Sequence, residues 1–390
     1  MIASLMLAKT ILNMKVAIDI RHLTHPQLSG VGLYTVNLIR ALARCAPQVE
    51  FVLFASGSKK TLARLPIITA PNITIVTKQI PNRLLFALLS LPGGPTLESF
   101  LPSPVDCWLF PDANIIRTNL PYALTVHDLS HDILPQYFTF KDRLRNRVAN
   151  VKKLTNQART ILAVSHSTKL DLVNRWHIDE RKITVTHLGV GSQFTSHVAP
   201  SDTNYQRGYG LNGPYILSLG TQEPRKNVES IITAFNNYRA TSPTRLQLAI
   251  GGAKGWKYQS ILDAAKASPY AADIIFLGYI HEKHKPALYR GAQTFLFPSF
   301  YEGFGLPVLE AMACGTPVIT SFTSSLPELL GDAGLMTDPF NITDLTTALT
   351  QLLASPSLRQ SFRTQGPLRA RQFTWDKTAA LTLDALYSLT

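Results

Sequence analysis

Short apolar segments alternate with longer helical segments along nearly the whole chain, and this alternation is the feature that most constrains its fold. Strands separated by helices are typical of the α/β class, with a doubly wound parallel sheet. The predicted strands cover 16–20, 51–54, 73–76, 107–110, 123–126, 160–164, 182–186, 215–219, 246–250, 274–277 and 294–297. Ligands of such sheets bind beyond the carboxyl ends of the strands, so we expect functional residues in the loops that follow them.

One polar stretch divides the chain into two predicted domains. A length of 390 residues allows two domains with separate cores, and 45% hydrophobic residues with 16% charged ones are typical of globular proteins. The stretch 193–213 has few apolar residues and is the predicted linker. We therefore expect an N-terminal domain over 14–200, a second domain over 201–370 and a terminal helix over 371–390.

The composition argues against a disulfide framework and against a membrane-spanning segment. The three cysteines, Cys45, Cys107 and Cys314, are few and far apart, which fits a reducing compartment and gives no metal-binding spacing. No apolar run approaches the ~18 residues of a membrane span. Met14 stands directly before the first strand, so residues 1–13 are interpreted as a start-site extension and not as a signal peptide.

The stretch 294–317 carries the clearest functional pattern. A short apolar strand ends at Pro298, a loop with Gly303 and Gly305 follows, and the spacing from Leu306 predicts a helix that ends at Gly315. Free backbone N–H groups at such a helix start, beside glycines that let the backbone come close, favour binding of a phosphate.

Two glutamates in the same stretch favour a ligand richer than phosphate alone. Glu302 lies in the loop and Glu310 in the helix. Carboxylates accept strong hydrogen bonds from sugar hydroxyls, whereas backbone donors hold phosphates, so the pair indicates a nucleotide sugar. In this context Glu302-x7-Glu310 resembles the signature of the retaining glycosyltransferases of family four. The alternative is a pair of solvated glutamates at a helix end.

The resemblance runs from about Met14 to the C-terminus, strongly in the second domain and loosely over 80–105. It implies the GT-B fold, in which two Rossmann-like, doubly wound domains face a central cleft. In this fold the N-terminal domain binds the acceptor, the second domain binds the nucleotide-sugar donor, and the C-terminal helix, here 371–390, crosses back to the N-terminal domain. The resemblance also implies that Glu310 holds the ribose hydroxyls of the donor and that Glu302 holds the transferred sugar. The backbone groups that it places at the donor belong to Gly303, Phe304, Gly305 and Leu306.

Arg225 and Lys226 follow the predicted strand 215–219 and precede a helix. At that position two cations would stabilise the charge that develops on a leaving nucleoside diphosphate. Some related sequences carry a further arginine where this chain has Thr221, which leaves more of this task to Arg225 and Lys226. The alternative is a solvated basic pair without a ligand.

Three further positions follow strands. His127, after the strand 123–126, resembles the family's active-site histidine, which contacts the donor sugar. Gly30 and Gly32, in a predicted loop before a helix over 33–44, resemble the glycine loop beside the donor phosphates and lack the third glycine of a dinucleotide fingerprint. Ile280 resembles the position beside the nucleotide base. A structural histidine and a plain strand-to-helix turn are the alternatives.

Positive charge is concentrated in the first half of the chain. Residues 1–195 contain 22 Lys and Arg against 11 Asp and Glu, and the remaining residues contain 16 against 14. The segment 138–159 predicts a basic amphipathic helix, with Leu144, Val148, Val151 and Ala158 at helical spacing. Such a helix either lies on an anionic membrane surface or packs its apolar stripe into the core. A nucleic-acid partner is not expected, because no aromatic residues for base stacking interleave with the charges over 141–159.

These features and the resemblance together predict a retaining, metal-independent hexosyltransferase. The chain has no Asp-x-Asp metal motif. The segments EPRKN and LPELLGDAG resemble bacterial mannosyltransferases of surface-polysaccharide (O-antigen and lipopolysaccharide) assembly. We therefore expect GDP-mannose as a co-substrate with no other cofactor, a glycan or lipid-linked acceptor, and a cytoplasmic protein peripheral on the inner face of the membrane.

Two other functions stay open at this point. A GT-B synthase that acts on soluble sugars, of the sucrose or glycogen type, would show no dependence on lipid. A non-catalytic sensor of nucleotide sugars would lack a site residue, whereas His127, Arg225, Lys226, Glu302 and Glu310 are all present.

Overall fold

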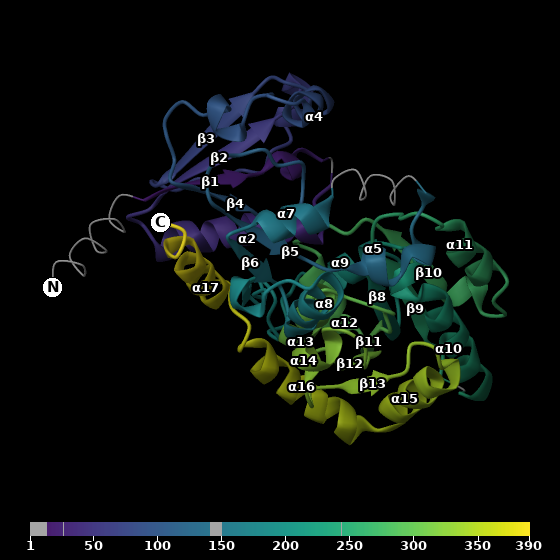
Figure 1. Cartoon of the computed structure of the whole chain (residues 1–390). Helices are drawn as coiled ribbons and strands as arrows, with labels where there is room; N and C mark the ends of the chain where they lie inside the picture. Colours follow the sequence, from purple (N-terminus) through teal and green to yellow (C-terminus); the bar gives the residue numbers. More distant parts are fainter. Residues whose placement is uncertain (1–13, 26, 141–149, 243) are drawn as a thin grey trace. The chain divides into compact units, whose positions relative to one another are not determined.

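The computed structural model describes residues 14–25, 27–140, 150–242 and 244–390, which form two compact units (Figure 1). The first unit comprises Met1–His131, Phe140–Gly189 and Thr374–Thr390. The second comprises Asp132–Thr139 and Val190–Phe373. The predicted boundaries at 200 and 370 stay predictions; the packing of the chain divides it at 189/190 and 373/374.

The first unit is built on a parallel sheet of seven strands in the order β3-β2-β1-β4-β5-β6-β7. Its strands are β1 (Lys15–Asp19), β2 (Glu50–Ser56), β3 (Ile73–Lys78), β4 (Cys107–Phe110), β5 (Tyr122–Val126), β6 (Thr160–Ala163) and β7 (Ile183–Val185). Its helices are α2 (Gly30–Cys45), α3 (Lys59–Leu62), α4 (Asn82–Ser90), α7 (Val151–Gln157), α8 (His166–Trp176) and α17 (Trp375–Tyr387), with α5 (Ser130–Ile133) at the unit boundary. The C-terminal helix α17 packs against α2 (Figure 1).

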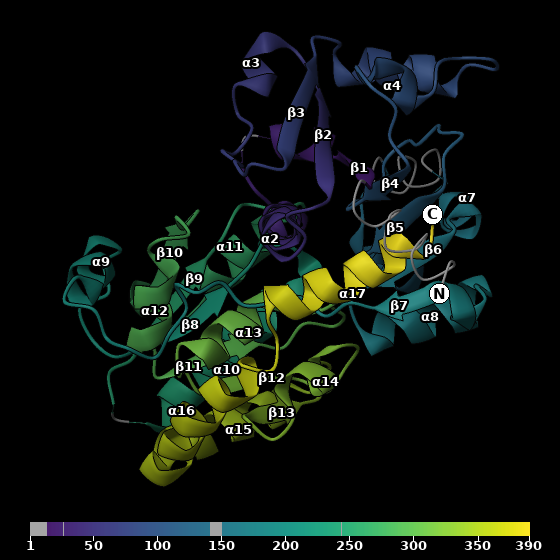
Figure 2. The same cartoon turned by 90° about the vertical axis from the view of Figure 1, so that its left-hand side faces the viewer.

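The second unit is built on a parallel sheet of six strands in the order β10-β9-β8-β11-β12-β13, with β8 and β11 at its centre (Figure 2). Its strands are β8 (Tyr215–Leu219), β9 (Gln247–Gly251), β10 (Ile274–Gly278), β11 (Thr294–Phe297), β12 (Val318–Ser321) and β13 (Leu335–Thr337). Its helices are α9 (Asp202–Gly208), α10 (Val228–Thr241), α11 (Gln259–Lys266), α12 (Lys285–Gly291), α13 (Leu306–Ala313), α14 (Leu326–Leu330), α15 (Ile342–Ala354) and α16 (Pro356–Ala370).

The central strands of both sheets are buried along their whole length, and most of their residues are apolar. Every residue of β4, β5, β8 and β11 is buried. A parallel sheet needs this cover because a βαβ connection places a helix on each face in turn. The sheets therefore form rigid platforms, and the loops at their carboxyl edges carry the polar chemistry.

The predicted fold class, two doubly wound parallel sheets, is confirmed. Two strands, β12 and β13, were missed, because each contains only two apolar residues followed directly by polar ones, VITS and LMT. The predicted linker 193–213 is wrong in part: it contains α9, whose Asp202 forms an ion pair with Arg290 at 2.6 Å. The polar composition of this short helix hid it from a search for apolar periodicity, since polar groups such as Asp202 and Gln206 contribute to its contact with α12.

Two predicted helix boundaries are also corrected. Gly30 and Gly32 lie in the first turn of α2 and not in a loop before it, because the side chain of Ser29 caps the helix and accepts a hydrogen bond from Gly32 N. The predicted helix 138–159 does not run unbroken, because Asn150 adopts a left-handed conformation with φ of 46° and begins α7. Residues 141–149 of that prediction, and the predicted extension 1–13, lie outside the described residues.

Candidate functional site

The loop after β11 is shaped by Gly305, which directly precedes α13. Its φ of 104° lies in a region that favours glycine, and a Cβ there would lie 2.8 Å from Leu326 Cδ2. Ser325 Oγ donates hydrogen bonds to the backbone carbonyls of Glu302 and Phe304, both at 3.0 Å. The loop from Gly303 to Leu306 is thereby fixed at the start of an eight-residue helix, whose N-terminal N–H groups favour an anion.

Glu302 joins this loop to the loop after β8 through two cations. Its carboxylate lies 3.0 Å from Arg225 Nη1 and 2.5 Å from Lys226 Nζ. Arg225 also donates to the carbonyl of Tyr301 at 2.7 Å and lies 2.8 Å from Glu223 Oε1 through Nη2. We call Glu223, Arg225, Lys226 and Glu302 the charge network. It contains two carboxylates and two cations, so its formal charges balance.

The charge network shifts the pKa of its two carboxyl groups in opposite directions. Burial alone would raise the pKa of Glu302, but the charges of Arg225 and Lys226 together outweigh burial and lower it. Burial raises the pKa of Glu223, and the nearby charge of Glu302 adds to that rise, while Arg225 and Lys226 offset it in part. Glu302 is therefore ionised at neutral pH and carries the negative charge that faces both cations.

Asn227 holds three loops of this edge together. It adopts a left-handed conformation with φ of 59°, and its side-chain amide donates to the carbonyls of Pro298 and Pro339 at 3.2 and 2.8 Å. Asn227 is buried, and the two carbonyls belong to the loops after β11 and β13. Because Asn227 directly follows Lys226, these bonds set the position of both cations against the end of β11.

Glu310 lies one turn into α13 and is buried. The hydroxyl of Tyr289 donates to its Oε2 at 2.9 Å, and Lys285 Nζ lies 3.9 Å from its Oε1. Burial raises the pKa of Glu310 to about 7; Lys285 opposes this rise and Glu282 adds to it. Oε2 is thus engaged, and Oε1 is the oxygen that remains for a ligand hydroxyl.

Ile280 follows β10 on the same edge. It is buried, and a Cβ on Gly251 at the end of β9 would lie 2.4 Å from Ile280 Cδ1. Gly252 N donates to the carbonyl of Gly278 at 2.8 Å, which joins the two strand ends. The second unit therefore brings Arg225, Lys226, Glu302, Glu310, Ile280 and the loop 303–306 to the carboxyl edge of one sheet.

His127 directly follows β5 in the first unit, as predicted. Its Nε2 lies 2.8 Å from the carbonyl oxygen of Pro111, and Tyr34 meets its ring edge to face at 4.9 Å. A carbonyl can only accept, so Nε2 carries the proton and Nδ1 of the neutral ring is an acceptor. Burial lowers the pKa of His127 by more than Pro111 and Asp128 raise it, so the neutral form prevails at neutral pH.

The glycines Gly30 and Gly32 share the first unit with His127. A Cβ on Gly32 would lie 3.0 Å from Leu28 Cδ2, whereas a Cβ on Gly30 would meet nothing within 4 Å. Gly32 thus packs tightly in the turn that starts α2, and Gly30 leaves room beside the start of the helix. Nothing in the sequence distinguished the two glycines.

Several site residues escaped sequence reasoning. Glu223, Lys285 and Tyr289 contact predicted site residues, and Asn227 directly follows Lys226. Glu223 and Asn227 flank Arg225 and Lys226 in the segment EPRKN, and this position in the sequence could have suggested both residues. Lys285 and Tyr289 contact Glu310 from α12, and no spacing of residues in the sequence predicts this contact between two helices.

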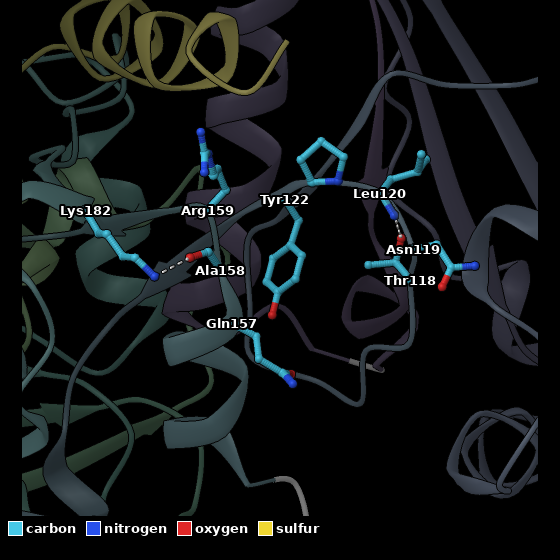
Figure 3. A pocket seen from close by; sticks show the side chains of 9 residues that line it. Thr118, Asn119, Leu120, Tyr122, Gln157, Ala158, Arg159 and Lys182 are labelled. Carbon is cyan, nitrogen blue, oxygen red and sulfur yellow. Dashed lines mark hydrogen bonds between the residues drawn. The ribbon is translucent and has the colours of Figure 1, made fainter.

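A cavity of about 640 Å³ lies elsewhere in the first unit (Figure 3). It is lined by residues at the amino ends of β5, β6 and β7, among them Tyr122, Arg159 and Lys182. None of the predicted site residues lines it. Parallel sheets bind ligands at the opposite edge, so we place the candidate site at the carboxyl edges and not in this cavity.

The described residues lack two features, a membrane-spanning helix and a cluster of metal ligands. In the described part of the chain no helix has the length and apolar character needed to cross a membrane. Within the same residues, no cluster of three or more His, Cys, Asp and Glu side chains is arranged to hold a metal ion.

The family of the chain follows from its relatives. Glycosyltransferase Family 4 matches residues 28–194, and Glycosyl transferases group 1 matches residues 204–369. O-antigen chain mannosyltransferase B of Escherichia coli is 30% identical over 383 residues, which are 95% of this chain and 99% of the relative. The chain belongs to the family 4, group 1 glycosyltransferases.

Solved structures agree with this glycosyltransferase assignment at the level of the fold. Sucrose-phosphate synthase from Thermosynechococcus elongatus has a TM-score of 0.77 at 20% identity and covers 96% of this chain and 98% of its own. HepE of Anabaena, solved in complex with UDP-glucose, has a TM-score of 0.72 at 18% identity, with 95% and 99% covered. The predicted GT-B fold of this glycosyltransferase is confirmed.

Proposed function

We propose that this glycosyltransferase moves mannose from GDP-mannose, with retention of configuration and without a metal ion, to a glycan or lipid-linked acceptor of a cell-surface polysaccharide. The observation that carries the proposal is the contact of Glu302 with Arg225 and Lys226 beside the start of α13. The choice of mannose rests on the likeness to O-antigen chain mannosyltransferase B.

In this proposal the two cations receive the diphosphate. Arg225 and Lys226, with the N–H groups of the loop 303–306, stabilise the negative charge of the leaving GDP, which is the task a metal ion performs elsewhere. Glu302 exchanges its ion pairs in part for hydrogen bonds from the sugar hydroxyls. Glu310 accepts from the ribose through Oε1, the oxygen not bonded to Tyr289.

His127 has a defined role in the same proposal. Because its Nε2 is held by the Pro111 carbonyl, it offers Nδ1 as an acceptor for a sugar hydroxyl. We assign Gly30 and Gly32, at the start of α2, to contacts with the donor phosphates and the acceptor. Ile280 marks the position of the base, which is read by backbone groups.

We place this glycosyltransferase in the cytoplasm and on the inner face of the membrane. The excess of positive charge in residues 1–195 supports attraction to anionic lipids. Lys152 and Lys153 of α7 are exposed and belong to this basic half of the chain. Vesicle flotation with and without anionic lipid tests this part of the proposal.

The second candidate function is a synthase that acts on soluble sugars. The TM-score of 0.77 with sucrose-phosphate synthase keeps this candidate open. A soluble acceptor would then be glycosylated at the same rate with and without membranes, and the donor would not have to be GDP-mannose.

The deciding experiment measures transfer in EDTA with GDP-mannose and UDP-glucose in parallel. We expect transfer from GDP-mannose to membrane extracts or mannose oligosaccharides, with an α-anomeric product by NMR. Lys226→Met should reduce the rate by about a hundredfold or more, as loss of one charge-stabilising group does. Lys266→Met, at an exposed position of α11, is the matched control and should leave the rate unchanged.

Three results would count against the proposal. Transfer only from UDP-glucose would replace the donor, and a β-anomeric product would contradict retention. Activity that vanishes in EDTA and returns with Mg²⁺ would contradict metal independence.

A further inference from the structure

Three aromatic rings of the second unit form a continuous stack that reaches the solvent. Tyr137 and Phe300 have ring centroids 5.3 Å apart and planes 19° apart, and Phe300 meets Phe340 at 4.8 Å. Phe340 is 69% exposed, while Tyr137 and Phe300 are half-buried. We call these residues the aromatic stack. Single exposed phenylalanines are common, but Phe340 continues two half-buried rings into the solvent, and a contiguous apolar surface of this kind is a candidate binding surface.

The aromatic stack is held in place by hydrogen bonds from each of its segments. Trp256 Nε1 donates to the Tyr137 carbonyl at 2.5 Å, and Lys257 Nζ donates to the Gln136 carbonyl at 3.0 Å. Phe340 N donates to Asp338 Oδ1 at 2.9 Å, a turn that fixes the backbone of the most exposed ring. An apolar ring fixed in a solvent-exposed position is preorganised for a partner.

The aromatic stack is continuous with the charge network. Phe300 N donates to the carbonyl of Arg225 at 3.0 Å, and Phe300 stands two residues before Glu302. Asn227 reaches the carbonyl of Pro339, which directly precedes Phe340. The same hydrogen bonds therefore position the backbone segments that carry the cations and the rings.

We propose that the aromatic stack binds sugar units of the acceptor, so that the acceptor is an oligosaccharide chain and not a monosaccharide. The C–H groups on the face of a pyranose ring carry partial positive charge and meet the negative face of an aromatic ring, while hydroxyls at the ring edge stay in water. This inference rests on the proposed function, which makes the acceptor a glycan. It adds that the glycan extends across Phe340.

Charge near the aromatic stack favours a neutral glycan over an anionic bilayer. Besides burial, the carboxylate of Glu229 raises the pKa of the Tyr137 hydroxyl, and Asp338 Oδ1 lies 2.9 Å from Phe340 N. Lys257 Nζ lies 3.0 Å from the carbonyl of Gln136, so carboxylates and a cation both lie near the stack. A surface that inserts aromatic rings into an anionic membrane is typically surrounded by Lys and Arg. The stack is therefore assigned to the sugar chain, and lipid or a second copy of the protein become outcomes of the test.

The test measures binding of α-linked mannotetraose and of methyl α-mannoside by calorimetry in the presence of GDP. We expect the tetrasaccharide to bind more tightly than the monosaccharide to the wild type. Phe340→Ala should weaken tetrasaccharide binding roughly three- to tenfold, the value of one stacked ring, and leave methyl α-mannoside and GDP unchanged. Phe340→Tyr should retain the affinity. Phe322→Ala, at a phenylalanine 54% exposed outside the stack, is the matched control.

Several results would overturn the inference. The first two are equal affinity of Phe340→Ala and wild type for the tetrasaccharide, and no binding of the tetrasaccharide at millimolar concentration. The other two are vesicle binding that requires Phe340, and a dimer in light scattering that dissociates in Phe340→Ala. Failure of the proposed function is separately visible. If the protein transfers mannose from GDP-mannose but binds the tetrasaccharide independently of Phe340, only this inference is contradicted. If tetrasaccharide binding requires Phe340 but no transfer from GDP-mannose occurs, only the proposed donor is contradicted.

Discussion

Two glutamates eight residues apart in this chain have opposite electrostatic environments. Glu302 meets two cations within 3.0 Å, and they lower its pKa despite burial. Glu310 has one cation at 3.9 Å, and burial raises its pKa to about 7. The Glu302 carboxyl is therefore ionised at neutral pH, whereas the Glu310 carboxyl gains or loses its proton near pH 7.

Glu310 should make the stability of the protein depend on pH. A carboxyl whose pKa rises from 4.5 to about 7 on folding binds more protons in the folded state, so stability is lost as pH rises from about 4.5 through 7. The full loss is roughly 3 kcal/mol. Glu310→Gln removes this loss, so relative to wild type it should gain stability between pH 5 and pH 8 in urea unfolding.

The control for this prediction is a second glutamate. Glu180→Gln changes an exposed carboxylate of the first unit and should give the same difference from wild type at both pH values. If Glu310→Gln also shows a difference that does not change with pH, burial does not raise the pKa of Glu310 as described.

Sequence reasoning reached the positions of these residues but not their partners. Glu302, Glu310, Arg225 and Lys226 were all predicted, because a strand, a glycine loop and a helix place residues at a known edge. The pairing of Glu302 with both cations could not be predicted, since it depends on how the loops after β8 and β11 meet. The contact of Tyr289 with Glu310 likewise depends on the packing of α12 against α13.

At the scale of elements, the loops at the carboxyl edge of the second sheet are joined by Asn227. Its two hydrogen bonds link the ends of three strands that are far apart in the sequence. Sequence periodicity predicted β8 and β11 with their observed bounds but missed β13 and α9. Short elements have too few residues to show a period, and their apolar or charged contacts come from tertiary packing.

Asn227 should therefore stabilise the second unit beyond its own conformation. Asn227→Ala leaves two buried carbonyls without their hydrogen-bond donor and places alanine at a positive φ. We therefore expect the free energy of unfolding to fall by roughly 3 kcal/mol. Glycine tolerates the positive φ, so the free energy of unfolding should fall by about 1 kcal/mol less in Asn227→Gly than in Asn227→Ala. Urea unfolding measures both. Equal losses in the two variants would show that backbone conformation contributes nothing, and a wild-type value in either would contradict the linking role.

At the scale of the whole molecule, two of the four passages of the chain between the units, at 189/190 and 373/374, involve residues that lie close together. In the first unit, Gly189 packs directly against the backbone of Thr374 and Trp375. In the second, Val190 N donates to the carbonyl of Phe373 at 3.2 Å. The sequence predicted a returning C-terminal helix, and α17 does belong to the first unit, where Trp375 and Leu386 are buried.

Gly189 should be intolerant of any side chain. A Cβ would lie 2.1 Å from Trp375 N, and backbone cannot move aside as a flexible side chain can. We expect Gly189→Ala to reduce the free energy of unfolding by roughly 3 kcal/mol, measured in urea. Gly213→Ala is the matched control, because a Cβ there meets nothing within 4 Å. Equal stability of the two variants would contradict the close approach.

The balanced charges of the charge network also determine how this glycosyltransferase responds to salt. Arg225 and Lys226 are only 13% and 14% exposed, and both already face carboxylates. Dissolved ions screen charges over about 8 Å in physiological solution, but the charge network presents little net charge for them to screen. Nucleotide affinity should then vary little with ionic strength. The exposed lysines of the basic half, such as Lys152 and Lys153, attract anionic surfaces without such protection. For the proposed membrane-associated transferase, raising the salt concentration should therefore weaken vesicle binding more than nucleotide binding.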